Sequence, residues 1–149
     1  RAAKEENAMV QLIVGEKGKG KTKILLDKAN AEVKNANGSV VYLDKSTKHM
    51  YELNNKIRLI DVMEYGIENS DEFVGFIRGI VSQDHDLEQM YLDGFLRISK
   101  LECNPENISK VLASLEKISN AYEVSFIISL SKDEKDLPED VKHMIVTSL

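Results

Sequence analysis

The sequence lacks the features that mark secreted and membrane proteins. Its 149 residues include one cysteine and no tryptophan. Because the single Cys103 cannot form a disulfide within the chain, we expect a reducing, cytoplasmic environment. No apolar stretch approaches the roughly 18 residues of a membrane-spanning helix. Residues 1–8 are too polar for a signal peptide. We therefore expect no membrane insertion.

The net charge and the spacing of the histidines argue against nucleic acids and histidine-bound metals as ligands. Acidic residues outnumber Lys and Arg by 25 to 20, which gives a formal net charge of −5. We therefore do not expect the broad basic surface with which many proteins cover nucleic acids. His49, His85 and His143 stand far apart, without the spacing of metal ligands. We interpret them as solvated or structural side chains.

Length and composition indicate one domain. A chain of this size buries about 70% of its unfolded surface, which is enough for a core of its own. No internal repeat or low-complexity segment divides it. Residues 1–8 are polar and precede the first apolar stretch, so we interpret them as an N-terminal tail of the kind that cloning adds. Residues 9–149 are then the single domain.

One stretch has a specific chemical signature. The residues Gly15-Glu16-Lys17-Gly18-Lys19-Gly20-Lys21-Thr22 fit G-x-x-x-x-G-K-[ST], the Walker A or phosphate-binding loop, at every fixed position. Glycine permits the positive φ values that turn backbone N–H groups toward a polyphosphate. Lys21 would bring an ammonium group to the β- and γ-phosphates, and Thr22 a hydroxyl to Mg²⁺. With Lys23 adding charge, we expect residues 15–23 to bind ATP or ADP with Mg²⁺.

The flanking sequence provides the context that this motif requires. Residues 9–14 form a short apolar run rich in β-branched residues, which predicts a buried strand. Residues 21–36 contain no Gly or Pro and repeat apolar side chains at helical spacing, which predicts a helix. Asn37 and Gly38 are expected to end it with positive φ values. Such a helix turns its positive dipole end toward the bound phosphates.

Strands and helices alternate along the rest of the chain. Further strands are predicted at residues 39–43, 57–60, 88–92, 124–130 and 143–147. Helices are predicted to begin near Ser46, at Ser70 and at Asn104. This alternation predicts an α/β protein of three layers, α/β/α, with a mainly parallel sheet of about five or six strands. Its ligand should lie at the carboxyl ends of the strands.

Three of the predicted strands end in aspartate, at Asp44, Asp61 and Asp93. A phosphate-binding loop needs such a carboxylate to hold the water shell of Mg²⁺. The strand before Asp61 is interrupted by Arg58, which makes this aspartate the least attractive of the three.

In its order of elements the sequence resembles the RecA-like ATPases, a division of the P-loop NTPases. The resemblance implies the P-loop NTPase fold and identifies Met90-Tyr91-Leu92-Asp93 with the Walker B strand. Asp93 would then be the carboxylate associated with Mg²⁺, alongside Thr22. The same resemblance makes Ser129 or Ser131, at the tip of a later strand, the γ-phosphate sensor.

The sequence departs from that family at one position of chemical importance. Many such enzymes orient the attacking water with a glutamate after the Walker B aspartate or at the tip of the second strand, where this chain has Gly94 and Asp44. Asp44 is one methylene shorter, and a misplacement of about 1 Å can cost roughly 100-fold in rate. We expect Lys21, Asp93 and Asp44 to support Mg-dependent ATP hydrolysis that is slow or stimulated by a partner. A second copy or another protein could supply an arginine, with Arg78 and Arg97 as the candidates.

Three other functions remain open. The missing glutamate favours a non-catalytic nucleotide sensor, or an assembly subunit of a larger motor of the secretion, twitching-motility or DNA-motor type. A small-molecule kinase needs a lid with arginines and an acceptor pocket, but the four arginines lie in no long insertion. A GTPase needs a guanine-reading N/T-K-x-D motif, which residues 131–134 match only distantly.

Overall fold

The computed structural model describes residues 8–149, so the proposed tail lies almost entirely outside the described residues. The strands are β1 (Val10–Val14), β2 (Ser39–Asp44), β3 (Arg58–Asp61), β4 (Leu87–Leu92), β5 (Ser125–Leu130) and β6 (Ile145–Ser148). The α-helices are α1 (Lys21–Val33), α2 (Ser70–Gln83), α3 (Phe95–Ile98) and α4 (Ile108–Tyr122). Short 3₁₀ helices lie in the connections, at Met50–Glu52, Val62–Tyr65, Pro105–Asn107, Glu134–Asp136 and Glu139–Met144.

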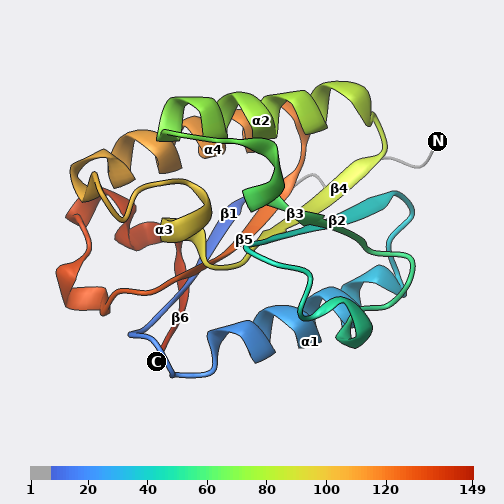
Figure 1. Ribbon diagram of the computed structural model, residues 1–149, viewed down its shortest axis with the longest axis horizontal. Coiled ribbons are helices and arrows are strands. Elements are labelled where there is room, and N and C mark those ends of the chain that lie inside the picture. The colour runs from blue at the N-terminus through green and yellow to red at the C-terminus, as the bar shows by residue number, and fades with distance from the viewer. Residues whose placement is uncertain (1–7) are drawn as a thin grey trace.

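The strands form one six-stranded sheet in the order β3-β2-β4-β5-β1-β6. Every pair of neighbouring strands is parallel. Helix α1 covers one face of the sheet, while α2 and α4 cover the other (Figure 1). The predicted three-layer α/β/α architecture is therefore confirmed, with a sheet that is entirely rather than mainly parallel.

Side chains of the central strands alternate between two hydrophobic clusters, as the two-residue period of a strand requires. In β4, Met90 and Leu92 face α2 and α4, whereas Tyr91 faces α1. In β2, Leu43 faces the first cluster and Tyr42 the second. The sheet is thus buried on both faces, which is typical of parallel sheets.

The structure corrects two predictions at the ends of helices. Helix α1 ends at Val33 instead of Ala36. Gly38 does not have a positive φ; it is needed because a Cβ there would lie 1.9 Å from the carbonyl oxygen of Asp86. Helix α2 begins at Ser70 as predicted, but its cap is Asn69, whose side chain accepts a hydrogen bond from the Glu72 amide.

Helix α3 was not predicted from the sequence. It begins directly after Gly94, which has a φ of 66°. Phe95, Ile98 and Leu101 are fully buried in the cluster beneath α2 and α4. Their three-residue spacing was the available signal, but one turn of helix is too short for periodicity to stand out.

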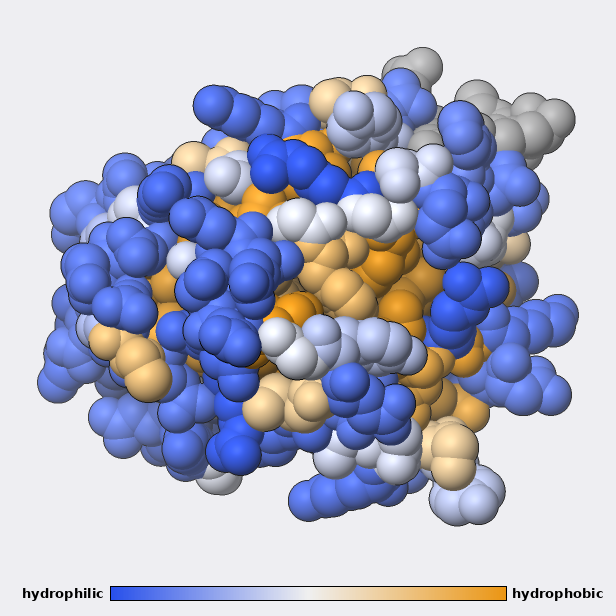
Figure 2. All heavy atoms as spheres, turned by 45° about the horizontal axis from the view of Figure 1, so that its top comes forward, coloured by the Kyte–Doolittle hydropathy of each residue, from blue (hydrophilic) through white to orange (hydrophobic). Residues whose placement is uncertain are grey.

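The outer surface on the side of α2 and α4 is polar over most of its area. Figure 2 shows hydrophilic side chains around a band where apolar side chains are exposed. Among residues 8–149, no helix is both long and apolar enough to cross a bilayer.

Candidate phosphate-binding site

The glycine-rich loop connects β1 to α1 at the carboxyl edge of the sheet. Gly18 and Gly20 have φ values of 84° and 90°, a conformation that side chains rarely adopt. A Cβ added at either position would meet no atom within 4 Å. The backbone conformation, rather than a lack of space, therefore requires glycine at both positions.

Lys21, the first residue of α1, bends back over the loop. Its side chain is largely buried, at 7% exposed, and Nζ donates a hydrogen bond of 2.9 Å to the carbonyl oxygen of Glu16. Burial lowers the pKa of the ammonium group, and the nearby Asp93 carboxylate opposes that effect. The lysine is thus held at the loop, with a backbone oxygen as its hydrogen-bond acceptor.

Asp93 is the centre of a hydrogen-bond network that joins four elements of the fold. Its Oδ1 accepts hydrogen bonds from Ser129 Oγ at 2.7 Å and from Thr22 Oγ1 at 3.2 Å. Its Oδ2 accepts one of 2.8 Å from the Tyr42 hydroxyl. Ser129 in turn accepts a hydrogen bond from the Gly94 amide. Only 4% of Asp93 is exposed, so this carboxylate is buried, oriented and well satisfied.

The alternation of side chains between the two faces of the sheet explains why these side chains meet. Tyr42, Tyr91 and Ile127 all face α1, and two residues further along the same strands stand Asp44, Asp93 and Ser129. The period of two therefore brings all three polar side chains to the α1 face. The strands are parallel, so their carboxyl ends meet where α1 begins with Lys21 and Thr22.

Asp44 lies at the tip of β2 and has a different environment. It is only 2% exposed, and its Oδ1 accepts a 2.7 Å hydrogen bond from the Lys45 amide. Its Oδ2 is buried and has no hydrogen-bond partner among the described residues. Burial raises the pKa of this carboxyl group, and the nearby charge of Asp93 raises it further. Asp44 therefore retains an unfilled capacity to accept a hydrogen bond or contact a cation.

The loop and the two aspartates enclose a cavity of about 540 Å³, which we call the loop cavity. This volume lies within the range of small-molecule sites, about 300–1,000 Å³. Its walls include Lys17, Gly18, Gly20, Lys21, Thr22, Asp44, Asp93, Ser129 and Ser131. The segment after β2 completes it with Lys45, Ser46, Lys48 and His49. None of these four residues was predicted from the sequence as a ligand-binding residue, although the two lysines follow a strand tip.

Several other predicted residues lie elsewhere. Asp61 caps the 3₁₀ helix after β3 through a hydrogen bond from the Met63 amide, and it does not line the loop cavity. Lys23 forms an exposed ion pair with Asp27 at 3.0 Å. Lys19 is exposed and does not line this cavity either. Arg78 lies along a separate groove between α2 and α4.

The oxygen atoms of the loop cavity suit Mg²⁺. Thr22 can donate to Asp93 while its oxygen lone pairs face a cation, and the buried Asp93 carboxylate lies beside it in the same cavity. Within residues 8–149, no cluster of three or more His, Cys, Asp or Glu side chains could hold a metal on its own. Mg²⁺ does not require one, because it commonly uses one or two carboxylates together with water and substrate phosphates.

Fold and site together define an all-parallel α/β/α domain with a glycine-rich loop facing two buried carboxylates. No family model matches the chain, and comparison with curated proteins finds no match.

Proposed function

We propose that this protein binds Mg-ATP in the loop cavity and hydrolyses it slowly, as a P-loop NTPase similar to the RecA-like ATPases. The observation that carries the proposal is the hydrogen bond between Thr22 and Asp93. It joins the last residue of the Walker A motif to the aspartate that resembles the Walker B carboxylate, across 71 residues of sequence.

Each residue has a defined part in this proposal. The amides of the glycine-rich loop would bind the phosphate oxygens, and Lys21 would exchange its contact with Glu16 for the β- and γ-phosphates. Thr22 and Asp93 would hold Mg²⁺, which when bound neutralises charge on the triphosphate. Water would attack the γ-phosphorus opposite the bridging oxygen, releasing ADP and inorganic phosphate. Asp44, with its free Oδ2, would orient that water.

Slow turnover is expected because Asp44 stands where many RecA-like ATPases, which the sequence resembles, use the longer glutamate. Burial and the neighbouring Asp93 raise the pKa of Asp44, because both disfavour its charged form. An arginine supplied by a neighbouring molecule is worth about 10³–10⁵ in kcat where it is known. A second copy or a protein partner could provide this group, with Arg97 and Arg78 as the residues to test.

Nucleotide binding is tested by thermal unfolding with ATP, ADP, GTP and GDP, each with and without Mg²⁺. Ligand at about 100 times its dissociation constant should stabilise the protein by roughly 2.7 kcal/mol. Lys21→Ala should remove most of that stabilisation. The matched control is Lys117→Ala, on the exposed side of α4. The absence of any shift with all four nucleotides at millimolar concentration would overturn the proposal.

Turnover is tested by single-turnover and steady-state phosphate release from dilute protein. We expect a rate far below the roughly 10 s⁻¹ of a typical enzyme, rising with protein concentration or with a partner. A rate near 10 s⁻¹ in dilute protein would show that one chain holds a complete catalytic site. Binding without turnover under all conditions would instead indicate the nucleotide sensor, which the short Asp44 side chain favours.

A further inference from the structure

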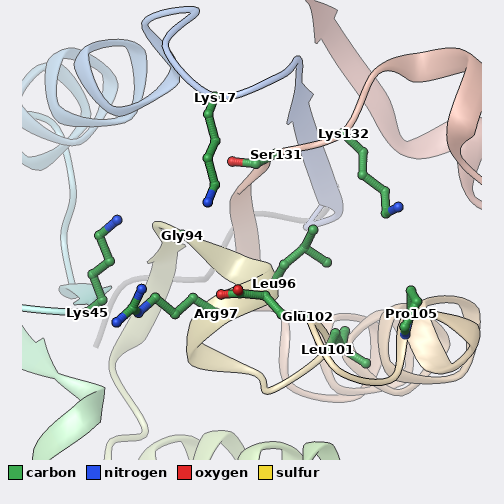
Figure 3. A pocket seen from close by; sticks show the side chains of 10 residues that line it. All are labelled: Lys17, Lys45, Gly94, Leu96, Arg97, Leu101, Glu102, Pro105, Ser131 and Lys132. Carbon is green, nitrogen blue, oxygen red and sulfur yellow. The ribbon is translucent and has the colours of Figure 1, made fainter.

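A second cavity, of about 300 Å³, adjoins the loop cavity on the side of α3. We call it the α3 cavity. Lys17, Lys45, Gly94 and Ser131 line both cavities, so the two spaces are neighbours with a common wall. Figure 3 shows Lys17 extending from the phosphate-binding loop toward this space, with Lys45 and Arg97 on one side and Lys132 on the other.

The walls of the α3 cavity carry an excess of positive charge. Four cationic side chains line it, against the single carboxylate of Glu102. They are Lys17, Lys45, Arg97 and Lys132. Among residues 8–149, none of these four side chains has an ion pair or side-chain hydrogen bond. Since the whole chain carries a net charge of −5, this local excess is not a general property of the surface.

The α3 cavity also has an apolar part. Leu96 and Leu101 belong to α3 and the turn after it, and Pro105 begins the next 3₁₀ helix. Leu101 is fully buried, so it anchors the turn after α3 in the hydrophobic core. An inorganic ion alone would leave the apolar part unused. A ligand with an anionic group and a small carbon body would contact both the cations and the apolar part.

We infer that the α3 cavity binds a small organic anion, a phosphate ester or a carboxylate, beside the terminal phosphate of the proposed nucleotide. Arg97 is suited to either group, because guanidinium forms paired hydrogen bonds with both. The volume lies at the lower end for ligand sites, which restricts the ligand to a small molecule. This inference deepens the proposed function and depends on it only for the neighbouring nucleotide.

The shared lysines link the two ligands. Two anions in adjoining cavities repel each other, and Lys17 and Lys45 would offset that repulsion from the common wall. If the organic anion changes the affinity for the nucleotide by some factor, the nucleotide must change the affinity for the organic anion by the same factor. Substituting Lys17 or Lys45 should therefore change the coupling between the ligands as well as each affinity.

The inference is tested by NMR titration with phenyl phosphate and with benzoate, in the presence of Mg-ADP. Benzyl alcohol is the uncharged control of similar size. Methyl groups of Leu96 and Leu101 report on the α3 cavity, and the amides of Gly18 and Gly20 report on the loop. We expect saturable shifts of both leucines with one or both anions at millimolar concentration, and none with benzyl alcohol. The comparison of the two anions identifies the preferred group.

Variants separate the α3 cavity from the loop. Arg97→Gln should weaken anion binding by at least about tenfold, because the amide cannot replace the paired, charge-assisted hydrogen bonds of the guanidinium group. Arg58→Gln, at an exposed side chain of β3 that lines neither cavity, should leave it unchanged. Absence of saturable leucine shifts, equal shifts with benzyl alcohol, or no effect of Arg97→Gln would each overturn the inference. If Mg-ADP alone does not shift the amide signals of Gly18 and Gly20, the proposed nucleotide site is overturned. The leucine titration then still tests the α3 cavity by itself.

Discussion

The tips of β4 and β2 carry two buried aspartates in the same cavity, and their surroundings differ. Asp93 accepts hydrogen bonds from three hydroxyl groups on three other elements. Asp44 accepts one, from the amide of the next residue, and its second oxygen has no partner among the described residues. The protein thus holds one carboxylate in a fixed orientation and leaves the other partly unsatisfied.

The two carboxylates therefore differ in how far hydrogen bonds offset the cost of burying them. Hydrogen bonds to Asp93 offset the cost of burying it, so its position adds rigidity to the site. Asp44 carries much of that cost uncompensated, as the raised pKa of its carboxyl group indicates. A cation or an ordered water at Asp44 would relieve the cost, which makes this tip of the sheet sensitive to the ligand.

The largest effect is expected from Asp93→Asn. The amide would place a donor where the hydroxyls of Thr22, Tyr42 and Ser129 now donate, leaving at least one of them unsatisfied. Unfolding free energy should fall by about 1–3 kcal/mol, and the Mg²⁺-dependent part of ATP affinity should fall more than tenfold. Chemical denaturation and calorimetric titration measure the two effects. A larger loss of Mg²⁺ dependence in Asp44→Asn would assign the metal to the other aspartate.

Asp44→Asn should have the opposite effect on stability. Removing the poorly satisfied charge should stabilise the ligand-free protein at neutral pH, on the order of 1 kcal/mol. The same change should lower ATP turnover, because Asp44 is the proposed water-orienting group. Thermal unfolding and phosphate release, compared with Asp61→Asn, measure both quantities. A loss of stability in Asp44→Asn would show that this carboxylate is better compensated than its contacts indicate.

Two stacked tyrosines allow a sharper test of the Asp93 network. Tyr42 and Tyr91 are both fully buried, and their ring centroids lie 6.0 Å apart. The Tyr42 hydroxyl donates to Asp93, whereas that of Tyr91 donates to Gln89. Each change to Phe should cost about 1 kcal/mol of stability. Only Tyr42→Phe should weaken Mg-ATP binding, by a few fold in calorimetric titration; an equal effect of Tyr91→Phe would exclude a specific role for the Tyr42 hydroxyl.

The smallest expected effect concerns pH. The pKa of Asp44 in the folded protein is raised above its ordinary value near 4, so protonation of this group stabilises the fold. That contribution is fully present below the unfolded pKa and is lost as pH rises through the folded pKa. The stability advantage of Asp44→Asn should therefore be absent in acid and grow toward neutral pH. Denaturation at a series of pH values measures it, and a constant difference would contradict the raised pKa.

Much of the fold could be predicted from short-range patterns. Apolar runs placed the strands to within a few residues, and the alternation with helices predicted the confirmed α/β/α architecture. Helix α3 and the role of Gly38 escaped prediction for different reasons. The first is one turn long, and the second depends on the close approach of residue 86, which is distant in sequence.

The lining of the loop cavity was predictable where a motif is continuous and where a predicted strand ends in a polar residue, as at Asp44, Asp93 and Ser129. Residues 15–22 carry the Walker A pattern in one stretch, and the left-handed glycines within it are observed. Tyr42 gave no signal, because a tyrosine inside an apolar strand is indistinguishable from core. The cations of the α3 cavity come from four separate segments, and single lysines and arginines are common on surfaces.

The sequence by itself determined the order of strands and helices and the backbone conformation of the loop. It also determined, through the two-residue period of the strands, that the polar side chains at the strand ends lie on the α1 face of the sheet. These are local properties, set by glycine content and by periods of two and 3.6 residues. Only the tertiary structure decided which tips meet. The order β3-β2-β4-β5-β1-β6 places Ser129 of β5 between the loop after β1 and Asp93 after β4. It leaves Asp61 at the edge strand, because pairing among distant strands depends on packing of the whole sheet.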